Sequence, residues 1–149
     1  MPLTTSFKNS LLSAICAKQS FTNSIYAGIA TNVGSDGTVT GEPNTTTHPS
    51  YARAAVAVYG GQVNHMGTAA EGAIENTTTI YFPEARTAWG NDFAYVCLFS
   101  SATGGTLIGY AHIVDENDDE TTIDISADTV PLIRSGSFKL SFEEPSANS

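Results

Sequence analysis

The hydrophobic pattern centres on one unbroken apolar run, residues 93–99 (FAYVCLF), the longest in the chain. The run is too short to span a membrane, and its aromatic and branched side chains favour a strand buried on both faces. Turn-forming residues flank it at 89–92 (WGND) and 100–105 (SSATGG), because glycine adopts positive φ and Asn or Asp bonds its own backbone. Residues 107–114 then have the pattern of a returning partner strand. We therefore expect a strand–turn–strand unit with Trp89 at its entrance.

Further apolar segments predict strands on both sides of this unit. They lie at 24–31, 51–59, 75–82, 121–125 and 138–142, and the last alternates most regularly, with every second side chain directed to the core. Seven or eight strands separated by turns are typical of an antiparallel β-sandwich or small barrel. We expect residues 1–149 to form a single all-β domain with one N-terminal helix. Its predicted core comprises Trp89, Phe93, Tyr95, Val96, Leu98, Phe99, Phe138, Leu140 and Phe142.

The N-terminal segment is the one helix candidate, at about residues 6–18. Thr5 or Ser6 can cap it, and Phe7, Leu11, Leu12 and Ile15 fall near one side at helical spacing. The simpler interpretation is a helix that covers one end of a sheet. The alternative is a segment that docks on a neighbouring subunit.

Residues 32–49 form a long stretch rich in Gly, Asn, Asp, Thr and Pro. A loop of this length is unusual in a small domain and often serves binding. It is therefore our first candidate for a partner-contact surface. The contact residues expected in it are Asn32, Asp36, Thr38, Glu42, Asn44 and His48.

Charge and composition exclude several classes of partner. The chain has 149 residues, of which 14% are charged, and a net charge of −9, whereas nucleic-acid binding needs clustered Lys and Arg. Neither a signal peptide nor an apolar segment long enough for a bilayer is present, so we expect folding in a cytoplasm and no membrane contact. Cys16 and Cys97 are expected to act as small hydrophobic residues without a disulfide.

Motifs for catalysis or metal binding are missing or incomplete. The acidic run 115–120 starts like a calcium loop, but Glu120 stands where glycine is needed and Ser126 where glutamate is needed. The three histidines have no ligand spacing, and the chain contains no G-x-S-x-G elbow or phosphate-binding loop. We expect no enzymatic activity, no catalytic residues, no metal and no cofactor.

Two prominent side chains, Arg53 and Trp89, have structural explanations. Arg53 lies on a strand of small residues, where a lone charge usually faces water or pairs with an acid such as Glu84 or Asp92. Trp89 stands at the head of the apolar run, where a tryptophan more often closes the core than forms a recognition platform.

Three segments resemble a family of small phage virion proteins commonly labelled tail fibre proteins. They are residues 51–56 (YARAAV), 82–90 (FPEA followed by WG) and 99–108 (FSSATGGTLI). The resemblance implies a virion protein, assembled in the host cytoplasm, whose signature residues are structural. Fibre length commonly comes from repeats or heptads, and this sequence has neither.

Our leading hypothesis is therefore a capsid decoration or cement protein, bound as a homo-oligomer to the major capsid protein. The closest alternative is a tail, baseplate or tail-fibre-associated protein of the same virion. A carbohydrate-binding receptor module would use exposed aromatic residues such as Tyr51, Tyr59 or Trp89. A hydrolase would require a His–carboxylate–Ser cluster, which the order of residues does not suggest.

Overall fold

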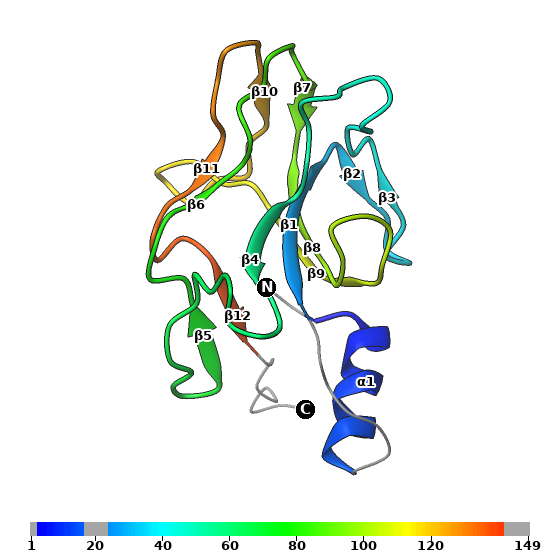
Figure 1. The fold of residues 1–149 in the computed structure, drawn as a ribbon, viewed down its shortest axis with the longest axis vertical. Coiled ribbons are helices and arrows are strands. Elements are labelled where there is room, and N and C mark those ends of the chain that lie inside the picture. The colour runs from blue at the N-terminus through cyan, green and yellow to red at the C-terminus, as the bar shows by residue number, and fades with distance from the viewer. Residues whose placement is uncertain (1–2, 17–23, 142–149) are drawn as a thin grey trace.

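The computed structural model describes residues 3–16 and 24–141. The elements are α1 (Thr5–Ile15), β1 (Ile25–Ala30), β2 (Asn32–Val33), β3 (Val39–Thr40), β4 (Ala54–Ala57), β5 (Ala73–Glu75), β6 (Ile80–Tyr81), β7 (Gly90–Phe93), β8 (Tyr95–Phe99), β9 (Leu107–His112), β10 (Ile123–Ile125), β11 (Leu132–Ile133) and β12 (Lys139–Ser141). All sheets are antiparallel (Figure 1). The predicted all-β class with an N-terminal helix is confirmed.

A four-stranded sheet in the order β4-β1-β8-β9 forms the centre of the fold. The β8–β9 hairpin is the predicted strand–turn–strand unit, with Tyr95 opposite His112. The apolar run does not form one strand, however. Phe93 ends β7, which pairs with β10, and Ala94 donates its N–H to the Ala30 carbonyl before β8 begins. The run is interrupted because its two halves pair with different partners.

Four two-stranded ribbons surround this sheet: β10-β7, β11-β6, β12-β5 and β2-β3. The described residues thus contain twelve short strands, where the pattern predicted seven or eight. The predicted strand 75–82 is divided into β5 and β6, because Asn76 leaves the strand and buries its side chain against neighbouring backbone. Its amide donates to the carbonyls of Thr78 and Arg134, and its oxygen accepts the Phe138 N–H.

The two faces of the central sheet carry separate hydrophobic clusters. Leu98 points into the larger cluster, which also holds Trp89 and Phe93, whereas Cys97 and Phe99 point into the smaller one. This is the alternation expected along a strand. Of the remaining predicted core residues, Phe138 is buried, Tyr95, Val96 and Leu140 are partly buried, and Phe142 lies outside the described residues.

Helix α1 begins directly beside the central sheet. Thr4, rather than Thr5 or Ser6, is the N-cap; its side chain accepts the Phe7 N–H, and its own N–H donates to the Ile108 carbonyl of β9. The helix ends at Ile15, and residues 17 and 18 of the predicted helix lie outside the described residues. In the part of the chain that the structure describes, no helix has the length and apolar character needed to cross a membrane.

Only part of the apolar side of α1 contacts the sheet. Phe7 is buried in the main core and Leu11 packs against it, but Leu12 and Ile15 are 59% and 78% exposed. The apolar residues cover a wider arc of the helix than the sheet can contact. Phe7 anchors α1 against the sheet, so the helix covers one part of it. The side chains of Leu12 and Ile15 stay exposed to solvent.

Candidate functional site: the Arg53 cluster

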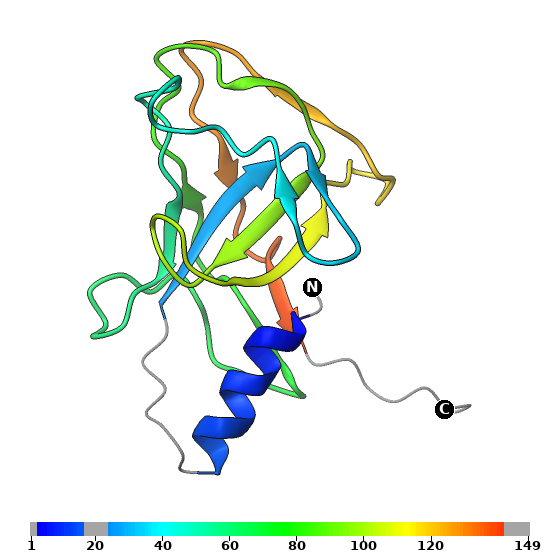
Figure 2. The ribbon, with the colours of Figure 1, turned by 90° about the vertical axis from the view of Figure 1, so that its right-hand side faces the viewer.

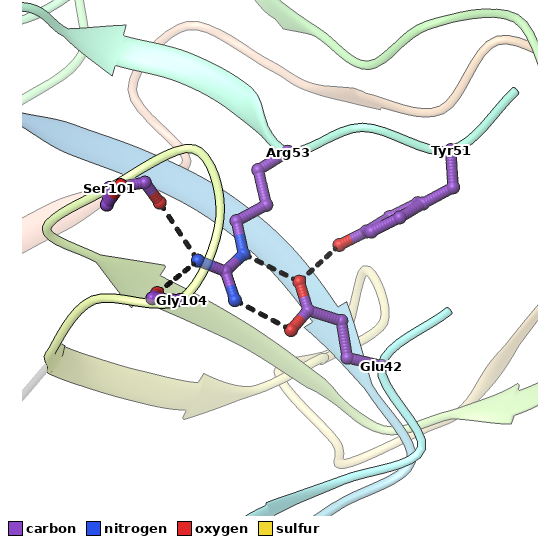
Figure 3. A network of polar contacts seen from close by, with 5 residues as sticks. All are labelled: Glu42, Tyr51, Arg53, Ser101 and Gly104. Carbon is purple, nitrogen blue, oxygen red and sulfur yellow. Dashed lines mark hydrogen bonds and ion pairs between the residues drawn. The ribbon is translucent and has the colours of Figure 1, made fainter. Parts of the chain in front are cut away.

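Arg53 is the centre of a polar network that joins several loops over β1 of the central sheet (Figure 3). Its Nε lies 2.7 Å from Oε1 of Glu42, and its Nη2 lies 2.9 Å from Oε2. Two parallel bonds of this kind fix the geometry of both side chains. The Arg53 side chain is only 8% exposed and that of Glu42 only 20%, so the ion pair is largely shielded from water.

The third guanidinium nitrogen binds the turn between β8 and β9. Nη1 donates to the carbonyl oxygens of Ser101 at 2.9 Å and Gly104 at 2.7 Å. The guanidinium carbon also lies 3.4 Å from the centroid of the Phe99 ring, a cation–π arrangement. Arg53 therefore ties the 100–106 turn to the start of β4 and to the loop that carries Glu42.

Tyr51 extends the network toward the core. Its hydroxyl donates to Oε1 of Glu42 at 2.8 Å, and the residue is buried. Burial raises the pKa of Tyr51 well above its usual value, and the negative charge of Glu42 raises it further. The phenol is therefore held as a neutral donor, which matches a carboxylate acceptor.

Trp89 closes the cluster on its inner side. Its ring meets that of Tyr51 edge-on, with centroids 5.1 Å apart, and lies near Phe82 at 6.5 Å. The indole Nε1 donates to the Ser50 hydroxyl at 3.0 Å. With 2% exposure, Trp89 is part of the core and is not available as a recognition platform.

Gly28 of β1 leaves the space in which the cluster fits. A Cβ atom at this position would lie 2.9 Å from Oε1 of Glu42, 3.0 Å from the Phe99 ring and 3.0 Å from the Tyr51 hydroxyl. These distances are too short for ordinary contacts, so glycine is required here by close approach.

A cleft of about 330 Å³ lies beside the cluster, between residues 42–45 and 102–104. Arg53 and Glu42 form part of its wall, yet each is already paired with the other. Its exposed rim includes the polar residues Asn44, Thr45 and Thr103, together with Ala52, Ala102 and Gly104. The cleft therefore presents small side chains and mainly apolar surface on loops that Arg53 holds in place, and it offers no unpaired charge.

Within residues 3–16 and 24–141, the remaining titratable side chains do not assemble a reactive centre. His48 contacts Thr47, His65 contacts Thr78, and His112 lies 3.6 Å from Glu120. Among the residues that the structure describes, no group of three His, Cys, Asp or Glu side chains could hold a metal ion. The acidic run forms a turn in which Asp115 Oδ1 accepts the N–H groups of Asn117 and Asp119.

The two cysteines lie in different environments. Cys16 is exposed and Cys97 is buried, and both are free thiols. Burial raises the pKa of Cys97 to about 12, with Glu42 adding to the effect. Cys97 therefore stays protonated within the smaller cluster.

The predicted contact loop contains the β2–β3 hairpin, and its turns are closed by side-chain bonds. Asp36 accepts the Thr38 N–H, which lowers the pKa of this carboxyl, and Asn44 accepts the N–H groups of Thr46 and Thr47. The six predicted contact residues divide by exposure. Asn32, Asp36, Thr38 and Asn44 are exposed, whereas Glu42 and His48 are only partly exposed. Glu42 is turned inward by its bonds to Arg53.

The prediction that Arg53 pairs with Glu84 or Asp92 is wrong. Glu42 pairs with it instead, across eleven positions of sequence. Glu42 follows Gly41, whose φ of +77° directs the chain back toward the sheet. In the sequence, Glu42 stands out only as an acid that directly follows a glycine in a loop with few charged residues. This pattern does not identify Glu42 as the partner of Arg53.

The three segments noted in the sequence meet in this cluster. Tyr51 and Arg53 come from the first segment, Trp89 from the second, and Phe99, Ser101 and Gly104 from the third. Their contacts are those of a fold-bracing network in a β-rich structural protein. A family model described as Podophage GP4 fiber I protein gp80 matches residues 2–130. The chain belongs to this phage fibre protein family, which confirms the resemblance and makes it a structural component of the virion. No curated protein matches the chain.

Proposed function

We propose that this chain is a non-enzymatic structural protein of the phage tail fibre or of the parts attached to it, where it binds other virion proteins. The observation that carries the proposal is the family match over residues 2–130. The matched region contains every residue of the Arg53 cluster. The family's description favours the tail-fibre alternative over capsid decoration, which was the leading hypothesis from sequence.

The geometry of the cluster supports a binding role that depends on shape. Arg53 braces two loops whose outer residues, Asn44, Thr45 and Thr103, line one cleft. Loops held in this way bind without a large ordering cost. In the proposed function, these two loops contact a neighbouring virion protein, and assembly takes place in the host cytoplasm.

The carbohydrate-binding alternative loses two of its three aromatic residues. Tyr51 and Trp89 are 4% and 2% exposed, and only Tyr59 remains open, at 65%. A sugar-binding platform needs an accessible ring face, which neither Tyr51 nor Trp89 offers. We therefore do not retain this class.

Copy number in purified virions tests the proposal. Quantitative mass spectrometry should find this chain at a small fraction of the amount of major capsid protein, because a particle carries few fibres. A ratio close to that of the capsid subunit would overturn the tail assignment and favour decoration of the shell. Absence from virions would overturn both.

A further inference from the structure

A pocket of about 430 Å³ lies between the start of α1, the turn of the β2–β3 hairpin and the start of β9. Figure 2 shows these three segments next to one another, with the start of α1 directly below the hairpin turn. Small residues of α1 and of the turn form much of its wall, together with Leu107 and Tyr110. Asp36 and Tyr110 are the only ionisable side chains among the described residues that line it. A ligand in this pocket therefore meets one carboxylate and one aromatic ring.

The carboxylate of Asp36 has no cationic partner among the described residues. Its Oδ1 accepts the Thr38 N–H at 3.0 Å, and this hydrogen bond lowers the pKa of the carboxyl. The residue is exposed. An ionised carboxyl has about four lone-pair sites for hydrogen bonds, so Asp36 can accept further donors from a ligand.

The first turn of α1 also borders the pocket, and its partial positive charge acts in the opposite direction. This charge amounts to about half an elementary charge, and the Thr4 side chain already accepts the Phe7 N–H there. Asp36 carries a full negative charge. The pocket therefore favours a cation over an anion.

Aromatic side chains lead from this pocket across β8 and β9. The rings of Tyr110 and Tyr95 meet edge-on with centroids 6.0 Å apart, and the Tyr95 ring lies 4.6 Å from that of His112. All three residues are half-buried. At the far end, Nε2 of His112 lies 3.6 Å from Oε2 of the exposed Glu120. The aromatic strip thus runs between two acids, and residues 87–133 contain no lysine or arginine.

We propose that this pocket binds an arginine side chain of a neighbouring virion protein, with the guanidinium paired to Asp36 and stacked on the ring of Tyr110. A planar guanidinium forms two parallel bonds with a carboxylate and also stacks on aromatic rings. Its methylene groups pack against Leu107. The net charge of −9 attracts a basic partner from a distance. That the partner is a virion protein rests on the proposed function, whereas the charge preference of the pocket does not.

Binding of blocked tripeptides to the purified full chain tests the inference. The probe is acetyl-Gly-Arg-Gly-amide, and binding is followed by the chemical shifts of backbone amides in NMR spectra. The same peptide with citrulline in place of arginine has a similar shape without the charge, and a glutamate peptide tests for an anion site. At millimolar concentrations the arginine peptide should shift the amides of residues 35–38 and 106–110, and the other two should not.

Substitutions identify the groups that hold the peptide. Asp36→Asn removes the charge but keeps an oxygen that can accept the Thr38 N–H, so the hairpin should fold unchanged. It should weaken binding of the arginine peptide at least about 10-fold. Tyr110→Leu removes the ring and should weaken binding about 3-fold. Asp128→Asn changes the net charge equally in the exposed loop between β10 and β11 and should leave binding unchanged.

The inference would be overturned if the arginine peptide caused no shifts, or if the citrulline or glutamate peptide caused equal ones. Equal binding by the Asp36→Asn and Asp128→Asn proteins would overturn it as well. The copy number of the chain in virions is measured separately. The proposed place in the virion can therefore fail while the pocket still binds arginine, and the reverse.

Discussion

Arg53 and Glu42 form a bidentate ion pair in which both side chains are largely buried, with N–O distances of 2.7 and 2.9 Å. The pair connects the loop that carries Glu42, the start of β4 and the turn after β8. Phe99 and Tyr51 also contact the pair, so it links the first and third family segments directly. Trp89 of the second segment packs against Tyr51.

Removal of the Glu42 carboxylate should destabilise the fold strongly. In Glu42→Ala, Arg53 remains buried without its counter-charge, and Tyr51 loses its acceptor. The free energy of unfolding should fall by about 3 kcal/mol, the range for breaking one partner of a buried pair. Urea denaturation measures the change. Glu84→Ala, at an exposed acid, is the matched control and should stay within about 0.5 kcal/mol of the parent; equal effects in the two variants would contradict the role of the pair.

Tyr51 should make stability fall at alkaline pH. Burial holds its folded-state pKa above the value of about 10 in an unfolded chain. The contribution of the neutral Tyr51 phenol to the free energy of unfolding is therefore fully present below pH 10. It is lost as the pH rises further, and the free energy of unfolding then falls by about 1.4 kcal/mol per pH unit. Tyr51→Phe should be less stable at pH 7, because a hydrogen bond to a charged acceptor is gone, and should lack this alkaline loss. Tyr59→Phe, at an exposed ring, should retain the parent's pH profile; a Tyr51→Phe profile parallel to it would argue against the assignment.

Gly28→Ala should destabilise the cluster by overpacking. The added methyl group meets Glu42, Phe99 and Tyr51 at 2.9–3.0 Å, and insertions of this size cost about 1–3 kcal/mol. A double-mutant cycle with Tyr51→Phe provides the control, because loss of the hydroxyl removes one of the three short contacts. Gly28→Ala should then cost less by at least about 0.5 kcal/mol. Strict additivity in thermal or urea unfolding would show that Gly28 and Tyr51 do not share this space.

Substitutions that remove the side-chain amide of Asn76 or replace it with a charged group should destabilise the fold. It is 1% exposed, donates to two carbonyls and accepts one N–H. Asn76→Asp removes both donors and places a carboxylate beside the carbonyls of Thr78 and Arg134. We expect a loss of about 3 kcal/mol or more at pH 7, partly recovered when acid protonates the carboxyl. Asn117→Asp, in an exposed turn, should be close to neutral, and an equally mild effect at Asn76 would contradict the hydrogen-bond assignment.

The sequence predicted the elements whose stability is local or strongly patterned. Residues 107–114 follow the apolar run after a glycine-rich turn, and the β8–β9 hairpin forms there. The N-terminal helix was also predicted from apolar residues at helical spacing, although its cap is Thr4 and not Thr5 or Ser6. Trp89 was correctly expected to close the core, since an indole at the head of an apolar run is usually buried.

The remaining features depend on contacts between distant segments. Phe93 and Tyr95 are two positions apart, yet the first belongs to a strand paired with β10 and the second to one paired with β1 and β9. No periodicity in the run reveals this division. Glu42 could not be matched with Arg53 for the same reason, because its loop has no regular pattern and its direction depends on Gly41. Helical spacing likewise shows which side chains share one side of α1, but not how many of them the sheet covers.

The most direct test of the central claim is the position of this chain on intact particles. Virions labelled with a gold-conjugated antibody against the chain can be imaged by electron microscopy. The account predicts label at the tail and its fibres, with few gold particles per virion. Label distributed over the whole capsid surface would contradict it and would restore the decoration hypothesis.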